Sequence, residues 1–313
     1  MDYDCVEIER RLAIGFNDYL SLAQRDRFVR MGKTLGEIAK EDPRFRLYTR
    51  ETRDVIHWLS RSRENHVLWH GDPGFPAFSP VRRHLPYMLF CQGEVPMDKM
   101  CMGAVGTRHA TYSGLQQAFR FGLEAARNSV SVASGFAEGI DQSVMNGCLA
   151  GGGPCIGVLA CGHDVEYPNL TLHMRSLIID SGGCVLSRFA PSEIAYKSNF
   201  LSRNIIIAAY GDFVVAVQAP GRSGTLNTCD YATQMGKELF VGSEGIGDRF
   251  VQVGTTALFQ DGAKIITSLS DIPFMKLRFS VVECDDRMSG NELGSGDLRR
   301  FGDRMYMVRE MIS

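Results

Sequence analysis

Three short glycine-containing segments carry the residue types that hold anions. They are Gly106-Thr107-Arg108, Ser134-Gly135-Phe136-Ala137-Glu138-Gly139 and Gly221-Arg222-Ser223-Gly224-Thr225. Glycine lets backbone N–H groups approach an anion closely, a following helix adds partial positive charge, and serine, threonine and arginine add side-chain donors. One such segment is a weak signal, because any turn from strand to helix favours glycine. Three of them, with arginine in two, predict an anion or nucleotide site.

A fourth cluster, residues 197–204, combines cations, amides and an aromatic ring within two helical turns. Lys197 and Arg203 suit phosphate, Asn204 offers an amide, and Phe200 can stack on a base. An alternative stays open, in which Phe200 belongs to the core and the cations form a solvated face. The candidate binding residues are therefore Gly106, Arg108, Ser134, Gly135, Lys197, Phe200, Arg203, Asn204, Ser223, Gly224 and Thr225.

Other nucleotide-binding and metal-binding motifs are absent from the sequence. No GxxxxGK[ST] occurs, and no GxGxxG is followed by an acidic residue about 20 positions on, which argues against a P-loop protein and a nicotinamide dehydrogenase. The 9 cysteines form no CxxC pair. One set of possible ligands, Cys148, Cys155, Cys161 and His163, is poorly spaced. We therefore expect reduced buried thiols, with no metal and no cofactor.

The four segments must be positioned by a regular alternation of strands and helices. Short apolar runs predict strands at Met102–Val105, Val130–Ala133, Ile156–Ala160, Cys184–Leu186, Phe213–Val217, Glu238–Val241 and Lys264–Ile266. Helical periodicity between them predicts helices at Tyr112–Arg127, Leu170–Asp180 and Leu226–Met235. This alternation indicates an α/β fold with a parallel sheet and helices on both faces. Such sheets bind ligands at the carboxyl ends of their strands, where the glycine-containing segments lie.

Composition and net charge limit the classes of protein to which the chain can belong. The chain has 313 residues, a net charge of −2 and 44% hydrophobic residues, which are ordinary values for a globular protein. Because there is no surplus of basic residues, nucleic-acid binding would need a local basic patch. The first residues lack the apolar segment of a signal peptide, and no apolar run reaches about 18 residues. We expect a cytoplasmic protein with no membrane contact.

Further motifs accompany the four segments in a fixed order. The series runs Asp72-Pro73-Gly74-Phe75-Pro76, Ala104-Val105-Gly106-Thr107-Arg108, Ser134-Gly135-Phe136-Ala137-Glu138-Gly139-Ile140-Asp141, Gly162-His163-Asp164-Val165-Glu166-Tyr167-Pro168, Asn199-Phe200-Leu201-Ser202-Arg203-Asn204 and Ser223-Gly224-Thr225-Leu226. This series resembles the DprA/Smf family of DNA-processing proteins, whose motifs read DPxYP, VGTR, SGLARGID, GxDxxYP, FPRRN and SGSL. The resemblance covers about residues 70–268.

The resemblance implies a fold and a domain organisation. We expect an extended Rossmann-like, doubly wound, mostly parallel sheet over residues 66–270, preceded by a small helical module over residues 1–65. Within that module, apolar spacing predicts a helix over Thr52–Ser60. Residues 271–313 are expected to form a short C-terminal extension with a final helix over Asp297–Met311. They are too few for the complete winged-helix domain that many relatives carry.

The resemblance also implies a function. The family binds single-stranded DNA, protects incoming strands in natural transformation and loads the RecA recombinase onto them; it is not known as an enzyme, and dimers are usual. For this chain it implies that Arg108 and Lys197 contact phosphate, Phe200 meets a base, and Arg203 and Asn204 orient the strand. The crevice would be completed by Gly106, Ser134, Gly135, Ser223, Gly224 and Thr225. We expect a non-enzymatic homodimer that binds single-stranded DNA in DNA uptake or recombination, with RecA as partner.

The chain departs from the family pattern at five positions. Glu138 and Ile205 stand where the family usually has arginine, Met145 replaces a histidine, Gln218 replaces a glutamate, and Arg188 stands where a glutamate is usual. The changes at 138 and 205 each remove a cation, and Glu138 adds an anion near the crevice. The removal of one phosphate-binding cation flattens the salt dependence of single-strand binding by about 0.7 units of slope.

Two other functions remain open. A nucleotide phosphoribohydrolase of the LOG type shares a similar fold and a GGxGTxxE segment, but here the acidic position is Thr228, which removes the carboxylate that the chemistry needs. A nucleotide-sensing protein could use the same crevice without turnover. His163 with Asp164 suggests acid–base chemistry, but the interpretation we favour is a loop cap. We similarly expect Asp141 to brace the helix after the second segment.

Overall fold

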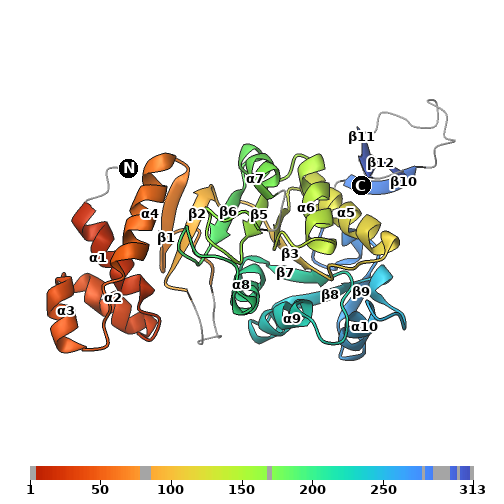
Figure 1. Cartoon of the computed structure of the whole chain (residues 1–313). Coiled ribbons are helices and arrows are strands. Elements are labelled where there is room, and N and C mark those ends of the chain that lie inside the picture. Colours follow the sequence, from red (N-terminus) through yellow and green to blue (C-terminus); the bar gives the residue numbers. More distant parts are fainter. Residues whose placement is uncertain are drawn as a thin grey trace.

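A nine-stranded sheet forms the centre of the chain (Figure 1). The computed structural model describes residues 5–77, 86–167, 171–276, 279–284, 297–301 and 304–310. The strands of the large sheet are β1 (Asn65–Trp69), β2 (Met88–Gly93), β3 (Cys101–Val105), β4 (Ser131–Ser134), β5 (Cys155–Val158), β6 (Cys184–Ser187), β7 (Phe213–Ala216), β8 (Glu238–Gly242) and β9 (Lys264–Ile266). The seven strands predicted from the sequence are confirmed to within two residues at each end.

The order of the strands is β1-β2-β6-β5-β4-β3-β7-β8-β9. From β6 to β9 all neighbours are parallel, whereas β1 and β2 add two antiparallel pairings at one edge. After β3 the chain builds outward in one direction through β4, β5 and β6, and then crosses back to place β7 on the other side of β3. The point where winding reverses therefore lies between β3 and β7, which confirms the predicted doubly wound, Rossmann-like α/β fold.

Helices cover both faces of the sheet (Figure 1). They are α1 (Cys5–Phe16), α2 (Leu22–Arg30), α3 (Leu35–Glu41), α4 (Thr49–Arg61), α5 (Tyr112–Arg127), α6 (Ile140–Ala150), α7 (Thr171–Asp180), α8 (Lys197–Tyr210), α9 (Gly224–Gln234) and α10 (Val253–Gln260). The three helices predicted between the strands appear as α5, α7 and α9, although Leu170, the predicted start of the second, lies outside the described residues.

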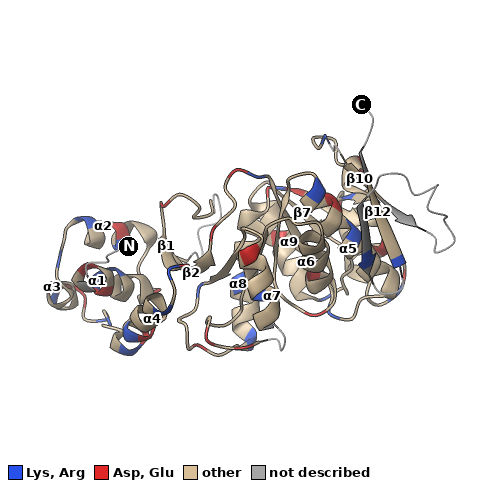
Figure 2. Cartoon of the chain, turned by 90° about the horizontal axis from the view of Figure 1, so that it is seen from above, with Lys and Arg blue, Asp and Glu red and all other residues tan. Residues whose placement is uncertain are grey.

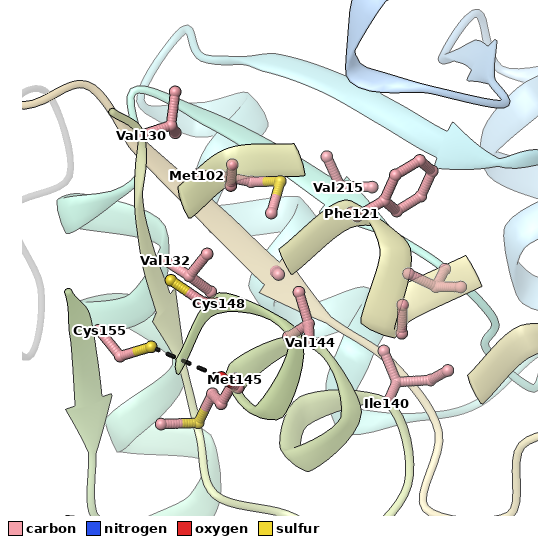
Figure 3. Close-up of a cluster of buried hydrophobic side chains, with 14 of the residues drawn as sticks. Met102, Phe121, Val130, Val132, Ile140, Val144, Met145, Cys148, Cys155 and Val215 are labelled. Carbon is pink, nitrogen blue, oxygen red and sulfur yellow. Dashed lines mark hydrogen bonds between the residues drawn. The ribbon is translucent and has the colours of Figure 1, made fainter. Parts of the chain in front are cut away.

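Two buried cores separate the faces because side chains alternate along each strand. In β3, Met102 and Ala104 pack in the core under α5 and α6, while Val105 packs on the opposite face with α8. Figure 3 shows the first of these cores, in which Met145 lies among apolar side chains and its carbonyl receives a weak Cys155 S–H contact at 3.9 Å. The cysteines that the structure describes fully are free and buried, as expected.

The N-terminal helices pack against the antiparallel edge of the sheet. Ile8 and Leu12 of α1 and Val55 and Trp58 of α4 share one buried cluster with Phe90 of β2. Helix α4 contains the predicted helix over residues 52–60. Within the described residues, no helix is both long enough and apolar enough to cross a membrane.

The predicted final helix over Asp297–Met311 is wrong. Residues 297–301 and 304–310 form strands β11 (Asp297–Phe301) and β12 (Arg304–Glu310), which pair antiparallel with β10 (Phe279–Cys284) in a second sheet. Tyr306 and Val308 of β12 pack with Val281 on Phe119 and Leu123 of α5. Pairing with the distant strand β10 and burial against α5 override the local helical pattern, and Met311 lies outside the described residues.

Candidate nucleic-acid interface

A cavity of about 600 Å³ opens at the carboxyl ends of β3 and β7. It lies at the point where the winding of the sheet reverses, which is where open parallel sheets bind ligands. The loop after β3, the first turns of α8 and the start of α9 form its walls. Most of the candidate residues line it, namely Gly106, Arg108, Lys197, Phe200, Arg203, Asn204, Ser223, Gly224 and Thr225. The fold therefore brings residues of all four sequence segments together around one cavity, the second segment through Ala137 alone.

The glycine and serine of the second segment that were predicted to bind do not line the large cavity. Gly135 lines a smaller neighbouring hollow of about 110 Å³, together with Arg108 and Phe200. Ser134 lines neither space: it is fully buried, and its hydroxyl donates to the carbonyl of Ala104 at 2.7 Å. This hydrogen bond joins β4 to β3, so the Ser134 hydroxyl does not donate to a ligand in the cavity.

Asp141 also lines the large cavity, although it is not among the binding residues predicted from the sequence. Its carboxylate lines the large cavity and accepts hydrogen bonds from the N–H groups of Gly106 at 3.3 Å and Gly135 at 3.2 Å. The N–H groups of Gly106 and Gly135, which we predicted from the sequence to bind an anion, thus bind an acidic side chain of the protein itself. Burial raises the pKa of Asp141 to about 6, against the opposing attraction of the Arg203 guanidinium.

Arg203 forms part of the floor of the large cavity. Only 4% of its surface is exposed, and its Nη1 donates to the carbonyl of Val158 at 2.9 Å. Burial lowers the pKa of Arg203 while the nearby Asp141 carboxylate raises it. Because a guanidinium keeps its charge in proteins, Arg203 and Asp141 form a buried pair of opposite charges beneath the site.

Phe200 stands between the two spaces and lines both. It is half-buried rather than part of the core, which removes the structural alternative left open for this residue. The guanidinium of Arg108 lies 5.1 Å from the centre of its ring, and Tyr167 meets it edge-on at 5.7 Å. Arg108 and Lys197 are exposed, so both can reach an anionic ligand from solvent.

Asn204 and Ser223 position the start of α9. The Asn204 amide donates to the carbonyl of Gly224 at 2.9 Å and to the side chain of Asn227 at 3.3 Å. Ser223 caps α9, since its hydroxyl accepts a hydrogen bond from the Leu226 N–H at 3.4 Å. These contacts join α8 to α9 and fix the wall of the cavity that faces Phe200.

Four of the five departures from the family pattern fall in three environments. Met145 and Ile205 are buried in the two cores and line neither space, so they leave the charge around the site unchanged. Gln218 is fully buried at the end of β7, where its amide donates to the Thr111 hydroxyl and the Glu244 carbonyl. Glu138 is exposed and lines the small hollow.

The charge of the site is local. In the view of Figure 2, basic and acidic positions alternate over the N-terminal helices and over the helices and loops around the sheet. Around the large cavity, by contrast, three cations (Arg108, Lys197 and Arg203) face one buried carboxylate. Since the buried Arg203 and Asp141 have opposite charges, the local positive charge of the cavity comes from the exposed Arg108 and Lys197.

His163 and Asp164 lie away from both spaces. His163 is buried, its Nε2 lies 3.0 Å from the carbonyl of Phe90, and its ring packs on Trp58 at 4.8 Å. Asp164 pairs with Arg61 of α4. This arrangement supports the interpretation of a structural loop rather than an acid–base pair. In the described part of the chain, no group of three or more His, Cys, Asp and Glu side chains is placed to hold a metal.

Fold and site together define a doubly wound α/β protein with a cationic ligand cavity at its switch point. The family model for DNA recombination-mediator protein A matches residues 66–275. The chain therefore belongs to this family, the DprA/Smf family of DNA-processing proteins.

Individual relatives agree with this assignment. The chain is 33% identical over 192 residues to DNA processing protein DprA of Streptococcus pneumoniae, across 60% of this chain and 66% of that one. It is 32% identical over 189 residues to DprA of Bacillus subtilis, across 60% of this chain and 63% of the relative. With a Mycobacterium tuberculosis protein called putative DNA processing protein DprA, the match covers 49% of the relative. The matched region thus spans about half to two thirds of the curated relatives.

Solved structures show the same fold. The crystal structure of DprA from S. pneumoniae is 26% identical, with a TM-score of 0.67, and the match covers 87% of this chain and 98% of that chain. A structure of DNA processing protein A from Helicobacter pylori, described for its single-stranded DNA binding mode, is 24% identical, with a TM-score of 0.57, over 66% of this chain and 93% of that one.

Proposed function

We propose that this protein binds single-stranded DNA in the large cavity, with no chemical turnover. The observation that carries the proposal is that Arg108, Lys197 and Phe200 converge on one cavity at the switch point of the sheet. Exposed cations suit the phosphate backbone, and a half-buried ring suits base stacking, which is the combination found in single-strand binding sites. Membership of the DprA/Smf family supports it, as does the single-stranded DNA bound by the H. pylori protein of the same fold.

Fluorescence anisotropy with a labelled oligonucleotide tests this proposal. The wild type is expected to prefer a single strand over a duplex and to bind more weakly as salt rises. The double variant Arg108→Ala/Lys197→Ala should weaken binding and flatten the salt dependence by about 0.7 units of slope for each of the two phosphate-binding cations. Lys264→Ala is the matched control, because this exposed lysine pairs with Glu238 on the remote strand β9. Absence of binding at low salt, or equal behaviour of all three proteins, contradicts the proposal.

We further propose that the bound strand is handed to the RecA recombinase, in DNA uptake or recombination, by a cytoplasmic homodimer of this chain. The support is the family alone. If the proposal is right, the wild type shortens the lag before RecA hydrolyses ATP on single-stranded DNA, and the double variant does not. Sedimentation at micromolar concentration would show a dimer. An unchanged lag, or a monomer at all concentrations, rejects the respective part.

The contacts in the cavity do not favour the phosphoribohydrolase alternative. Thr228, at the position where such an enzyme carries its acid, is buried and donates to the Gly224 carbonyl at 3.4 Å. The carboxylate that does line the cavity, Asp141, is held by hydrogen bonds from the N–H groups of Gly106 and Gly135, which gives it a structural role. Incubation with nucleoside monophosphates is expected to release no base; measurable release would make the protein an enzyme.

A further inference from the structure

The small hollow beside Phe200 has the size and walls of a site for a planar group. Its volume is about 110 Å³, whereas one water molecule needs about 10–15 Å³ on the same measure. It therefore has room for a group of several heavy atoms. The lining residues are Arg108, Gly135, Ala137, Glu138, Leu159, Ala160, Tyr167 and Phe200.

The walls of the hollow combine aromatic and small apolar side chains. Phe200 and Tyr167 meet at an interplanar angle of 70°, so one ring can contact the face of a flat guest while the other meets its edge. Leu159 and Ala160, at the end of β5, add apolar surface. Since Phe200 also lines the large cavity, a strand bound there can place one of its bases in the small hollow.

Glu138 gives this hollow a hydrogen-bonding preference. Its side chain is exposed and, within the described parts of the chain, forms no hydrogen bond or ion pair, although Arg108 lines the same space. An ionised carboxylate only accepts hydrogen bonds. Cytosine and adenine present an exocyclic amino group that donates, whereas thymine and uracil present a carbonyl oxygen at the corresponding position; guanine carries a carbonyl oxygen there and its amino group at C2. A carboxylate therefore attracts the amino group of cytosine or adenine and repels the carbonyl oxygen of thymine or uracil.

We propose that the small hollow seats one base of a bound strand and that Glu138 selects a base with an exocyclic amino group. This inference rests on the proposed single-strand binding. The protein then discriminates between bases at one position of the bound strand, whereas phosphate contacts and stacking alone tolerate any base sequence. Glu138 is the specificity-determining residue, and Phe200 and Tyr167 supply the walls that hold the base in reach.

Oligodeoxycytidine and oligodeoxyuridine of equal length provide the sharpest comparison. Their bases have the same ring size and lack the thymine methyl group, but cytosine carries an amino group where uracil carries a carbonyl. We would measure dissociation constants at pH 8, where cytosine is unprotonated, in one salt concentration. Wild-type protein is expected to bind oligodeoxycytidine about fivefold more tightly, the lower end of the discrimination that a well-placed base contact provides.

Two variants separate base selection from general electrostatics. In Glu138→Gln the amide both donates and accepts, so it can serve either base, and the ratio of the two dissociation constants should fall to about one. Glu166→Gln is the matched control: it removes an exposed negative charge beside Tyr167 without touching the hollow. Both variants should bind each oligonucleotide somewhat more tightly than wild type, but Glu166→Gln should keep the wild-type ratio.

The outcomes distinguish this inference from the proposed function. Tight binding of both oligonucleotides with equal affinity overturns the selection by Glu138 and leaves single-strand binding intact. A preference for cytosine that persists in Glu138→Gln also overturns it, since another residue must then read the base. Failure to bind either oligonucleotide overturns single-strand binding itself, and base selection with it.

Discussion

The guanidinium of Arg203 fills the space that a side chain on Gly135 would need. Nη1 of Arg203 would overlap with a Cβ atom at position 135, and Arg203 is held in place by its hydrogen bond to the Val158 carbonyl. The glycine of the second segment is thus required for close approach of a buried cation, and not for donation to a ligand. This relationship links β4, β5 and α8 beneath the binding site.

Gly135→Ala is therefore expected to destabilise the protein and to weaken binding together. The added methyl group forces Arg203 out of its buried position, and overpacking of this kind costs typically about 1–3 kcal/mol of the free energy of unfolding. Urea denaturation measures the destabilisation. Gly36→Ala is the control, because nothing lies within 4 Å of a Cβ at this helical position and the change should be neutral or stabilising. Equal stabilities of Gly135→Ala and wild type would refute the steric role.

Phe200 and Arg108 should contribute to DNA binding in ways that salt separates. Phe200→Leu removes base stacking, worth about 1–3 kcal/mol per base, and should weaken binding equally at all salt concentrations. Arg108→Ala removes a phosphate contact and should lower the salt slope by about 0.7. Titrations at several salt concentrations measure both effects. Phe250→Leu, at a ring that is 78% exposed and lines neither space, should change nothing. A changed slope in Phe200→Leu would speak against stacking.

The sequence predicted the sheet well because buried parallel strands are short apolar runs between glycine-rich turns. Segments such as Phe213–Ala216 and Cys184–Ser187 carry this signal by themselves. The gathering of Arg108, Lys197 and Ser223 around one cavity could also be predicted, since the carboxyl ends of parallel strands meet at one edge. The order in which these segments follow one another along the chain is the basis of the resemblance to a known family.

Other features depend on geometry that local sequence does not encode. Asp141 takes the N–H groups of Gly106 and Gly135 because two loops from different strands converge on one helix start. The hydroxyl of Ser134 turns inward to Ala104, which neighbouring residues do not reveal. At the C-terminus, Arg304–Glu310 becomes a strand through pairing with residues 279–284. Each of these depends on contacts between segments far apart in the chain.

Gln218→Glu is expected to destabilise the protein at neutral pH, even though the family usually carries glutamate there. The buried amide of Gln218 donates to the Thr111 hydroxyl at 2.8 Å and to the Glu244 carbonyl at 2.7 Å. An ionised carboxylate cannot donate, so it would face the Glu244 carbonyl oxygen unpaired, at a cost of about 1–3 kcal/mol or more. Urea denaturation at pH 7 measures this cost, and acid should reduce it because a protonated carboxyl donates again. The control Gln234→Glu lies on the exposed surface of α9 and should have little effect.

His163 should make the protein sensitive to mild acid. Burial lowers the pKa of His163 to about 3 from the ordinary value of 6.5, because the charged ring is disfavoured beside Trp58 and near Arg175 and Arg61. Above pH 6.5 the ring is neutral in both folded and unfolded chains, and its contribution to stability is fully present. As pH falls below 6.5, His163 binds a proton in the unfolded chain but stays neutral in the folded chain. The free energy of unfolding therefore decreases progressively down to about pH 3.

Between pH 7 and pH 5 this residue alone should lower the free energy of unfolding by about 2 kcal/mol. Urea denaturation of wild type and His163→Gln at both pH values isolates the effect, since glutamine can still donate to the Phe90 carbonyl but does not titrate. Asp141 and Glu124, whose buried carboxyls have pKa values raised to about 6 and about 7, contribute in the opposite direction but equally in both proteins. The stability of wild type should therefore fall more steeply toward pH 5 than that of His163→Gln. Parallel pH profiles of the two proteins would show that His163 is not the group that senses acid.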